Sequence, residues 1–177
     1  VPVARRPCVA RALWEHRRER AFEKILSGNR DISCMTCHLP QYATGDDRSL
    51  SIGQGASGTG PDRVQPQGLF IPRNAPPAFN LASMQHLFWD GRVEKELHGR
   101  LSTPAGNQLT PRMRRVLEFG PVSAIGMFPV GNRDEMRAYT GNELATISDT
   151  DNTAIWDGLM HRLVQIPEYR RMFGQGY

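Results

Sequence analysis

Apolar residues recur at mixed three- and four-residue spacings in several stretches of the chain, and this spacing predicts amphipathic helices. The first stretch covers residues 9–27, where six positions follow the pattern: Ala10, Leu13, Trp14, Phe22, Ile25 and Leu26. Gly28 and Asn29 come next, and both tolerate the left-handed backbone that closes a helix. We therefore expect a helix that ends near Ser27.

Four further helices are expected along the rest of the chain, over residues 78–90, 111–119, 133–147 and 151–165. The second has Pro111 after Thr110, which suits a capped first turn. The last has Asp151 or Thr153 near its start, and its pattern puts five residues on one face: Ile155, Trp156, Leu159, Met160 and Leu163. No segment alternates regularly enough to predict a strand, so the expected fold class is mostly α.

Residues 31–77 show little periodicity, because Gly and Pro interrupt every window of this segment. The whole chain has 17 Gly and 13 Pro in 177 residues. Irregular loops of such length inside a compact domain are uncommon and usually functional. We expect a long ordered loop organised by a bound group.

Composition narrows the class of protein. Hydrophobic residues make up 39% and charged residues 23%, as in soluble globular chains, and no run approaches the roughly 18 apolar residues of a membrane span. The net charge of +4 is spread along the chain, which does not favour nucleic-acid binding. The expectation is one domain without a membrane span.

The segment Cys34-Met35-Thr36-Cys37-His38 is a C-x-x-C-H motif, in which two thiols bind a haem covalently and the histidine ligates its iron. A thioredoxin-like redox pair would need a preceding strand and a zinc site a second ligand pair, and neither is apparent. Cys8 is left over, as a small core or terminal residue or an intermolecular partner. Because this haem attachment occurs outside the cytoplasm, we expect an exported protein whose signal peptide has been removed.

The ligand on the other face of the iron separates electron transfer from ligand chemistry. A surface or packed position is the more common role for the remaining histidines, and His86 is the foremost ligand candidate among them because it lies in the apolar segment before Trp89. Met84 and Met127 are possible thioether ligands, although a core role is the better interpretation in a chain with seven methionines.

Four segments around the motif occur in a characteristic order: LSGNRDISCMTCH, SIGQG, PRNAPPAFN and LFWDGRVE. Together they resemble the bacterial di-haem cytochrome c peroxidase family, which includes the methylamine-utilisation di-haem enzymes. The resemblance implies the N-terminal, peroxide-reacting haem domain, with a cytochrome c-like fold. We accordingly expect an extension over 1–27 and a haem-binding core over 28–177.

The resemblance also assigns roles. Cys34, Cys37 and His38 match the residues that hold one haem c. Trp89 matches an electron relay between the two haems, although a buried core aromatic is the plain alternative.

Asn74 matches a residue that helps bind calcium between the domains. Glu135, six residues after Pro129, matches the acid/base of peroxide cleavage. A solvated charge at a helix end is the alternative for Glu135.

Departures from the family pattern matter as well. Gln54 stands where many of these peroxidases have a histidine that closes the resting iron, so an open site is implied. Ile125, four residues before Pro129, replaces the usual glutamine. No second C-x-x-C-H is present in these 177 residues.

The resulting hypothesis is a periplasmic c-type haem protein that reduces H2O2 or another small oxidant. Gln54, Trp89, Pro129 and Glu135 form its candidate catalytic set. Electrons would come from a donor cytochrome or cupredoxin, through a second haem domain or chain. The alternatives are a non-enzymatic electron-transfer cytochrome or haem subunit of a larger complex, and a haem sensor whose open iron binds a small gas.

Overall fold

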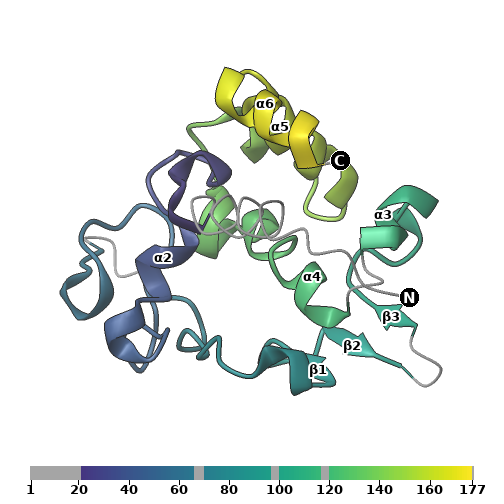
Figure 1. Ribbon diagram of the computed structural model, residues 1–177. Helices are drawn as coiled ribbons and strands as arrows, with labels where there is room; N and C mark the ends of the chain where they lie inside the picture. The colour runs from purple at the N-terminus through teal and green to yellow at the C-terminus, as the bar shows by residue number, and fades with distance from the viewer. Residues whose placement is uncertain (1–20, 66–69, 97–99, 117–119, 177) are drawn as a thin grey trace.

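The computed structural model describes residues 21–65, 70–96, 100–116 and 120–176 (Figure 1). Its α-helices are α2 Cys34–Cys37, α3 Pro111–Val116, α4 Pro121–Ile125, α5 Asn152–Val164 and α6 Pro167–Gly176. Long irregular segments connect them (Figure 1). A mostly helical chain with long loops is confirmed, while the cytochrome c-like arrangement and the division at residue 27 stay predictions.

Single turns make up much of the remaining regular structure. They are 3-10 turns at Lys24–Leu26, Pro40–Tyr42, Gly60–Asp62, Leu81–Ser83, Gly106–Gln108, Pro129–Gly131 and Glu143–Thr146, and a π-helical turn at Arg133–Arg137. Two of them, Pro40–Tyr42 and Gly60–Asp62, and α2 fall within 31–77, so this segment is irregular as expected. Its backbone is held by specific hydrogen bonds described below.

A small antiparallel sheet was not predicted. β1 His86–Leu87 pairs with β2 Val93–Lys95, which pairs with β3 Leu101–Ser102. The register places His86 opposite Glu94 and Leu87 opposite Val93. Strands of two or three residues are too short to show an alternating pattern, which explains why the sequence did not reveal them.

The helix predicted over 78–90 is wrong. Asn80 and Phe88 have positive φ angles of 58° and 67°, which an α-helix does not accommodate. The segment instead forms the 3-10 turn Leu81–Ser83 followed by β1.

The helix predicted over 133–147 is also wrong as one element. Ala138 and Gly141 have φ angles of 67° and 88° and separate the π-helical turn from the 3-10 turn Glu143–Thr146. Each turn has its own asparagine cap: the Asn132 side chain accepts from the amides of residues 134 and 135, and Asn142 from those of residues 144 and 145.

The last predicted helix is confirmed as α5, with Asp151 as its N-cap accepting a 3.0 Å hydrogen bond from the Ala154 amide. Four of the five residues expected on its buried face are buried: Ile155, Trp156, Leu159 and Leu163. Met160 is 43% exposed. Around the helix axis it lies on the outer side of Trp156, at the edge of the buried face. Helix α6 was not predicted and begins at Pro167, a residue suited to a first helical turn.

The first predicted helix lies largely outside the described residues, as does Cys8. In the described part, Glu23 is extended and a separate 3-10 turn follows, so the helix does not run unbroken to Ser27. Residues 111–116 of the predicted helix 111–119 are helical, and 117–119 are outside the described part.

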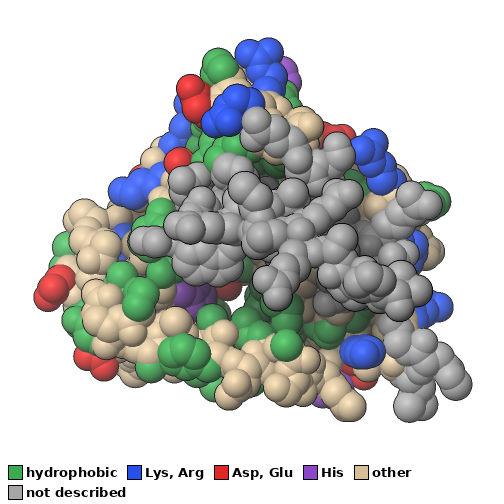
Figure 2. All heavy atoms as spheres, in the orientation of Figure 1, with side chains coloured by type: hydrophobic (Ala, Val, Ile, Leu, Met, Phe, Trp, Pro, Cys, Tyr) green, Lys and Arg blue, Asp and Glu red, His purple; other side chains and the backbone are tan. Residues whose placement is uncertain are grey.

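The hydrophobic core joins α5, the sheet and the segment before α2. α4 packs on β1 and β2, and α5 packs on α6 and on the turn Lys24–Leu26. Cys34 and Cys37 lie against this core. Hydrophobic side chains line a recess on the face drawn in Figure 2. Among the described helices, none is long and apolar enough to cross a membrane.

Candidate haem-attachment site

Helix α2 brings the two cysteines of the motif together. The Ser33 amide donates a 3.0 Å hydrogen bond to Thr36 Oγ1, which ties the start of the helix to its first turn. Cys34 and Cys37 are three residues apart in this turn, so they lie on neighbouring positions of one face.

Both cysteines are free thiols. Burial raises the pKa of Cys37 to about 11, although the nearby Arg63 guanidinium opposes this shift. Burial also raises the pKa of Cys34. Both sulfurs therefore stay protonated near neutral pH, and they lie beside apolar side chains where a macrocycle would be buried.

His38 ends α2, and its ring is held by the following loop. Its Nδ1 donates to the Thr44 carbonyl at 2.8 Å, which leaves Nε2 as the ring nitrogen with a lone pair. Such a second hydrogen bond is the usual way to orient a metal-ligating histidine. Ala43 and Thr44 have φ angles of 52° and 64°, and this double left-handed turn directs the carbonyl to the ring.

The loop over residues 51–55 packs directly on the segment that carries Glu135. The Gln54 amide donates to the Asp134 carbonyl at 2.9 Å. Gly53 lies so close to this backbone that an added Cβ would be 3.0 Å from the Glu135 Cα and closer still to the Asp134 carbonyl. The Cys37 Sγ lies 4.0 Å from the Ile52 carbonyl oxygen, so the same loop also touches α2.

Arg63 fixes this loop from inside. It is 2% exposed, and its guanidinium donates to the carbonyls of Ile52, Gly53 and Gly58 at 2.6, 2.5 and 2.9 Å. Nothing in the sequence marks this role, because an arginine in a Gly- and Pro-rich stretch looks like a surface residue. Its charge also acts on Cys37, as described above.

Glu135 lies in the π-helical turn Arg133–Arg137, which follows the 3-10 turn that begins at Pro129. Its Oε2 atom is buried and accepts no hydrogen bond from the described residues. Burial raises the pKa of this carboxyl, while Arg92 lowers it and Asp134 and Asp90 raise it further. The loop that contacts Cys37 through Ile52 also binds the backbone next to Glu135. The burial of Oε2 does not support the alternative of a solvated charge.

Trp89 is 59% exposed, so the alternative of a buried core aromatic is wrong. Its indole Nε1 donates to the Asn74 backbone carbonyl at 2.9 Å. The two residues that the resemblance places between the haem domains therefore touch each other at the surface.

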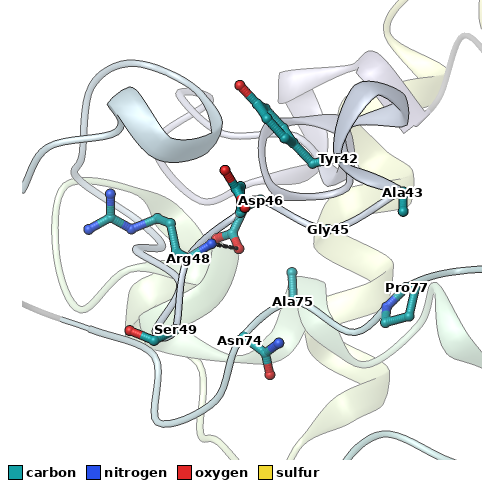
Figure 3. Close-up of a pocket in the computed structure, with 10 residues that line it drawn as sticks. Tyr42, Ala43, Gly45, Asp46, Arg48, Ser49, Asn74, Ala75 and Pro77 are labelled. Carbon is teal, nitrogen blue, oxygen red and sulfur yellow. Dashed lines mark hydrogen bonds between the residues drawn. The ribbon is translucent and has the colours of Figure 1, made fainter.

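Asn74 also lines a cleft of about 420 Å³ with acidic and polar neighbours (Figure 3). Asp46 is 2% exposed, and its Oδ1 accepts a 3.3 Å hydrogen bond from the Arg48 amide. Carboxylate and amide oxygens suit calcium. The described residues nevertheless bring no three acidic, histidine or cysteine side chains together as a metal site.

The candidate ligands for the other face of the haem iron lie in different parts of the structure. The His86 imidazole is largely exposed on β1, where its Nδ1 lies 3.8 Å from Glu94 Oε2, and Met84 is 44% exposed. Met127 packs against the core, and its carbonyl accepts a hydrogen bond from Trp156 at 2.7 Å. Ile125, at the end of α4, also packs against the core and offers no polar group.

Free cysteines one helical turn apart, next to a histidine with one ring nitrogen held by the backbone, have the donor set and orientation of a c-type haem protein. A family model for di-haem cytochrome c peroxidase matches residues 21–177. The chain belongs to this family.

Two curated relatives support the assignment. The methylamine utilization protein MauG of Methylorubrum extorquens is 30% identical over 98 residues, covering 55% of this chain and 24% of the relative. The cytochrome-c peroxidase IdrP2 of Pseudomonas sp. strain SCT is 32% identical over 81 residues, covering 46% of this chain and 19% of the relative. The matched regions thus span about a quarter or less of these relatives.

Proposed function

We propose that this chain carries the peroxide-reacting haem c of a di-haem peroxidase and reduces H2O2 to water. One observation carries the proposal: Glu135 offers a buried carboxyl oxygen without a partner among the described residues, in a segment bound to the same loop that touches Cys37. An acid/base for peroxide cleavage needs such a sheltered carboxyl close to the reacting group.

Reduction of H2O2 cleaves its O–O bond, consumes two electrons and two protons, and releases two water molecules. A haem bound at Cys34 and Cys37 supplies the redox chemistry. His38 holds the group through Nε2, with its ring oriented by Thr44. Glu135 accepts a proton from one peroxide oxygen and returns it to the departing oxygen, so that hydroxide is not the leaving group.

We propose that the electrons come from outside these 177 residues, which hold one C-x-x-C-H motif. We propose that they enter through Trp89 from a second haem domain or chain, supplied by a donor cytochrome or cupredoxin. The exposure of the Trp89 indole supports this route. Calcium at Asn74 is proposed as the ion that holds the second domain, and it would need oxygen ligands from that domain. We also propose a periplasmic location, because c-type haem attachment occurs outside the cytoplasm.

The test is Glu135→Gln in the haem-loaded protein. We expect an unchanged haem spectrum and a fall of about a hundredfold or more in the rate constant for H2O2. Glu168→Gln, an exposed change on α6, is the matched control and should react like the parent. An unchanged rate constant in Glu135→Gln would remove this residue from the chemistry.

The exposed indole of Trp89 also fits the second candidate, a non-enzymatic electron-transfer cytochrome. The two functions differ in iron ligation. A high-spin ferric spectrum that changes on addition of stoichiometric H2O2 supports the peroxidase. A low-spin spectrum that is indifferent to peroxide supports the electron-transfer protein.

A further inference from the structure

Arg63 and Cys37 meet at one backbone oxygen. Arg63 Nε donates to the Ile52 carbonyl at 2.6 Å, and Cys37 Sγ lies 4.0 Å from the same oxygen. The guanidinium and the sulfur are therefore no further apart than the sum of these two distances. Because Arg63 is 2% exposed, solvent screens its charge only weakly.

The groups that hold the Arg63 guanidinium carry no net charge. They are three backbone carbonyls, those of Ile52, Gly53 and Gly58. Among the described residues, none forms an ion pair with Arg63. An arginine does not lose its proton in proteins. The loop therefore holds one permanent positive charge whose neutral partners leave its field in place.

Two carboxylates, those of Asp31 and Asp46, act on Arg63 from a longer range. Asp31 is engaged elsewhere, because its Oδ1 accepts a hydrogen bond from Gln54 Nε2. Of the charged groups that act on the Cys37 thiol, Arg63 has the largest effect, and it lowers the pKa of that thiol. The neighbouring carboxylates thus reduce the field of Arg63 at the sulfur without reversing its sign.

A positive charge at this place acts on the redox equilibrium of a haem attached to Cys37. Ferric haem takes up one electron on reduction and loses one unit of positive charge. A fixed positive charge beside the group disfavours the ferric form relative to the ferrous form, and burial of the charge strengthens the effect. The expected result is a higher reduction potential.

We propose that the buried charge of Arg63 raises the reduction potential of the haem attached at Cys37, so that this haem accepts electrons more readily from a donor. The inference rests on the haem attachment in the proposed function, and it deepens the redox side of that function without depending on its peroxide chemistry. An anchor that only holds the loop would need hydrogen-bond donors but no charge, so the charge is the property to test.

The test separates the charge of Arg63 from its hydrogen bonds. Arg63→Gln and Arg63→Lys both lose the forked set of donors, but only lysine keeps a positive charge. Midpoint potentials of the haem-loaded proteins are measured by spectroelectrochemistry at pH 6, which favours the charged ammonium. We expect Arg63→Gln to shift the equilibrium about tenfold toward ferric haem, a fall of about 59 mV for a one-electron couple. Arg63→Lys should stay close to the parent.

Two controls accompany these variants. Gly58→Ala keeps Arg63 but crowds the loop, because an added Cβ would lie 2.7 Å from the Asp62 carbonyl oxygen. Arg112→Gln removes an exposed positive charge on α3. Both should keep the parental potential, the first because the buried charge remains and the second because solvent screens the lost one. If Arg63→Gln does not take up haem, Arg63→Met removes the charge with an apolar chain.

An unchanged potential in the neutral variant overturns the proposal. An equal fall in Arg63→Lys or in Gly58→Ala also overturns it, because the potential would then follow the geometry of the loop. A lowered potential in Arg63→Gln together with a normal peroxide rate constant in Glu135→Gln overturns the proposed peroxide chemistry and leaves the role of Arg63 intact. The reverse pair of results removes Arg63 and leaves the peroxidase, so the two failures are distinguishable.

Discussion

The indole N–H of Trp89 donates a 2.9 Å hydrogen bond to the backbone carbonyl of Asn74. The bond links two segments 15 residues apart and holds an aromatic ring that is 59% exposed. The exposure and the fixed position of this ring support the electron entry proposed above, because a ring held in one position meets a partner in a constant geometry.

Trp89→Phe is therefore expected to slow reduction of the haem by a reduced c-type cytochrome, with little loss of stability. The missing hydrogen bond should cost about 1 kcal/mol in the free energy of unfolding. Trp156→Phe is the matched control, because Trp156 also donates its indole N–H to a carbonyl but is 8% exposed in the core. This control should lose more stability and keep the rate of reduction, as measured by urea unfolding and stopped-flow absorbance. Equal rates in the two variants would argue against electron entry at Trp89.

Glu135→Gln should stabilise the protein at neutral pH while it impairs the reaction with peroxide. Burial raises the folded-state pKa of Glu135 above its unfolded value, so folding favours the protonated carboxyl. The stability contributed by that proton is present below the unfolded pKa and is lost as the pH rises through the folded pKa. Because glutamine cannot ionise, we expect the free energy of unfolding of Glu135→Gln to exceed that of the parent by about 1 kcal/mol at pH 7.

The stability difference should vanish near pH 3, well below the unfolded-state pKa, where the parent carboxyl is protonated in both states. Urea unfolding at the two pH values measures it, with Glu168→Gln as the control for loss of a negative charge. A variant less stable than the parent at pH 7 would show that the ionised carboxylate is satisfied in the folded protein.

Local sequence signals predicted the parts of the fold that local interactions determine. The apolar face of α5 and its Asp151 cap can both be recognised in the sequence. The five residues of the C-x-x-C-H motif are enough to predict haem attachment. The broken helices were missed because Phe88 and Ala138 are left-handed in the structure, and neither residue type indicates that conformation in a sequence. Apolar spacing alone does not separate a helix from two turns.

The contacts that build the site were beyond local reasoning. Asp31 and Gln54 are 23 residues apart, and Gln54 meets Asp134 across 80 positions, a pairing that only the folded chain defines. Arg63 was missed for the same reason, since its partners are backbone carbonyls that any residue would offer.

Gly53→Ala tests the close approach between this loop and the Glu135 segment. An added Cβ would overlap the Asp134 carbonyl, so the loop must move away and lose the Gln54–Asp134 hydrogen bond. We expect a loss of about 1–3 kcal/mol in stability and a slower reaction with peroxide. Gly126→Ala is the control, because its φ is −73° and nothing lies within 4 Å of the added Cβ. Equal stability in the two variants would show that the loop can move away from the Glu135 segment without a loss of stability.

Arg162→Met should lower the free energy of unfolding more than a substitution at the surface does. This arginine is 5% exposed on α5, and its guanidinium donates to the carbonyls of Ile25, Ser27 and Gly28 at 3.0, 2.6 and 2.9 Å. These carbonyls precede the haem motif. Methionine removes this donor from all three, while the Ser27 carbonyl keeps its 3.3 Å hydrogen bond from the Arg30 amide. We expect a loss of about 3 kcal/mol or more in urea unfolding, and Arg170→Met, exposed on α6, should change little. A small loss in Arg162→Met would mean that water replaces the guanidinium.

Glu143→Gln tests the remaining partner of Arg162. The hydrogen bond from Arg162 Nε at 2.6 Å lowers the pKa of Glu143 to about 2, below its unfolded value. The stabilisation is therefore complete above about pH 4.5 and is lost as the pH falls toward 2. Because the Glu143 side chain is 57% exposed, the effect should stay below about 1 kcal/mol at pH 7. Glu143→Gln should remove this part of the acid sensitivity, so that parent and variant converge in urea unfolding between pH 4 and pH 2. A constant difference over that range would assign the contribution of Glu143 to packing instead of charge.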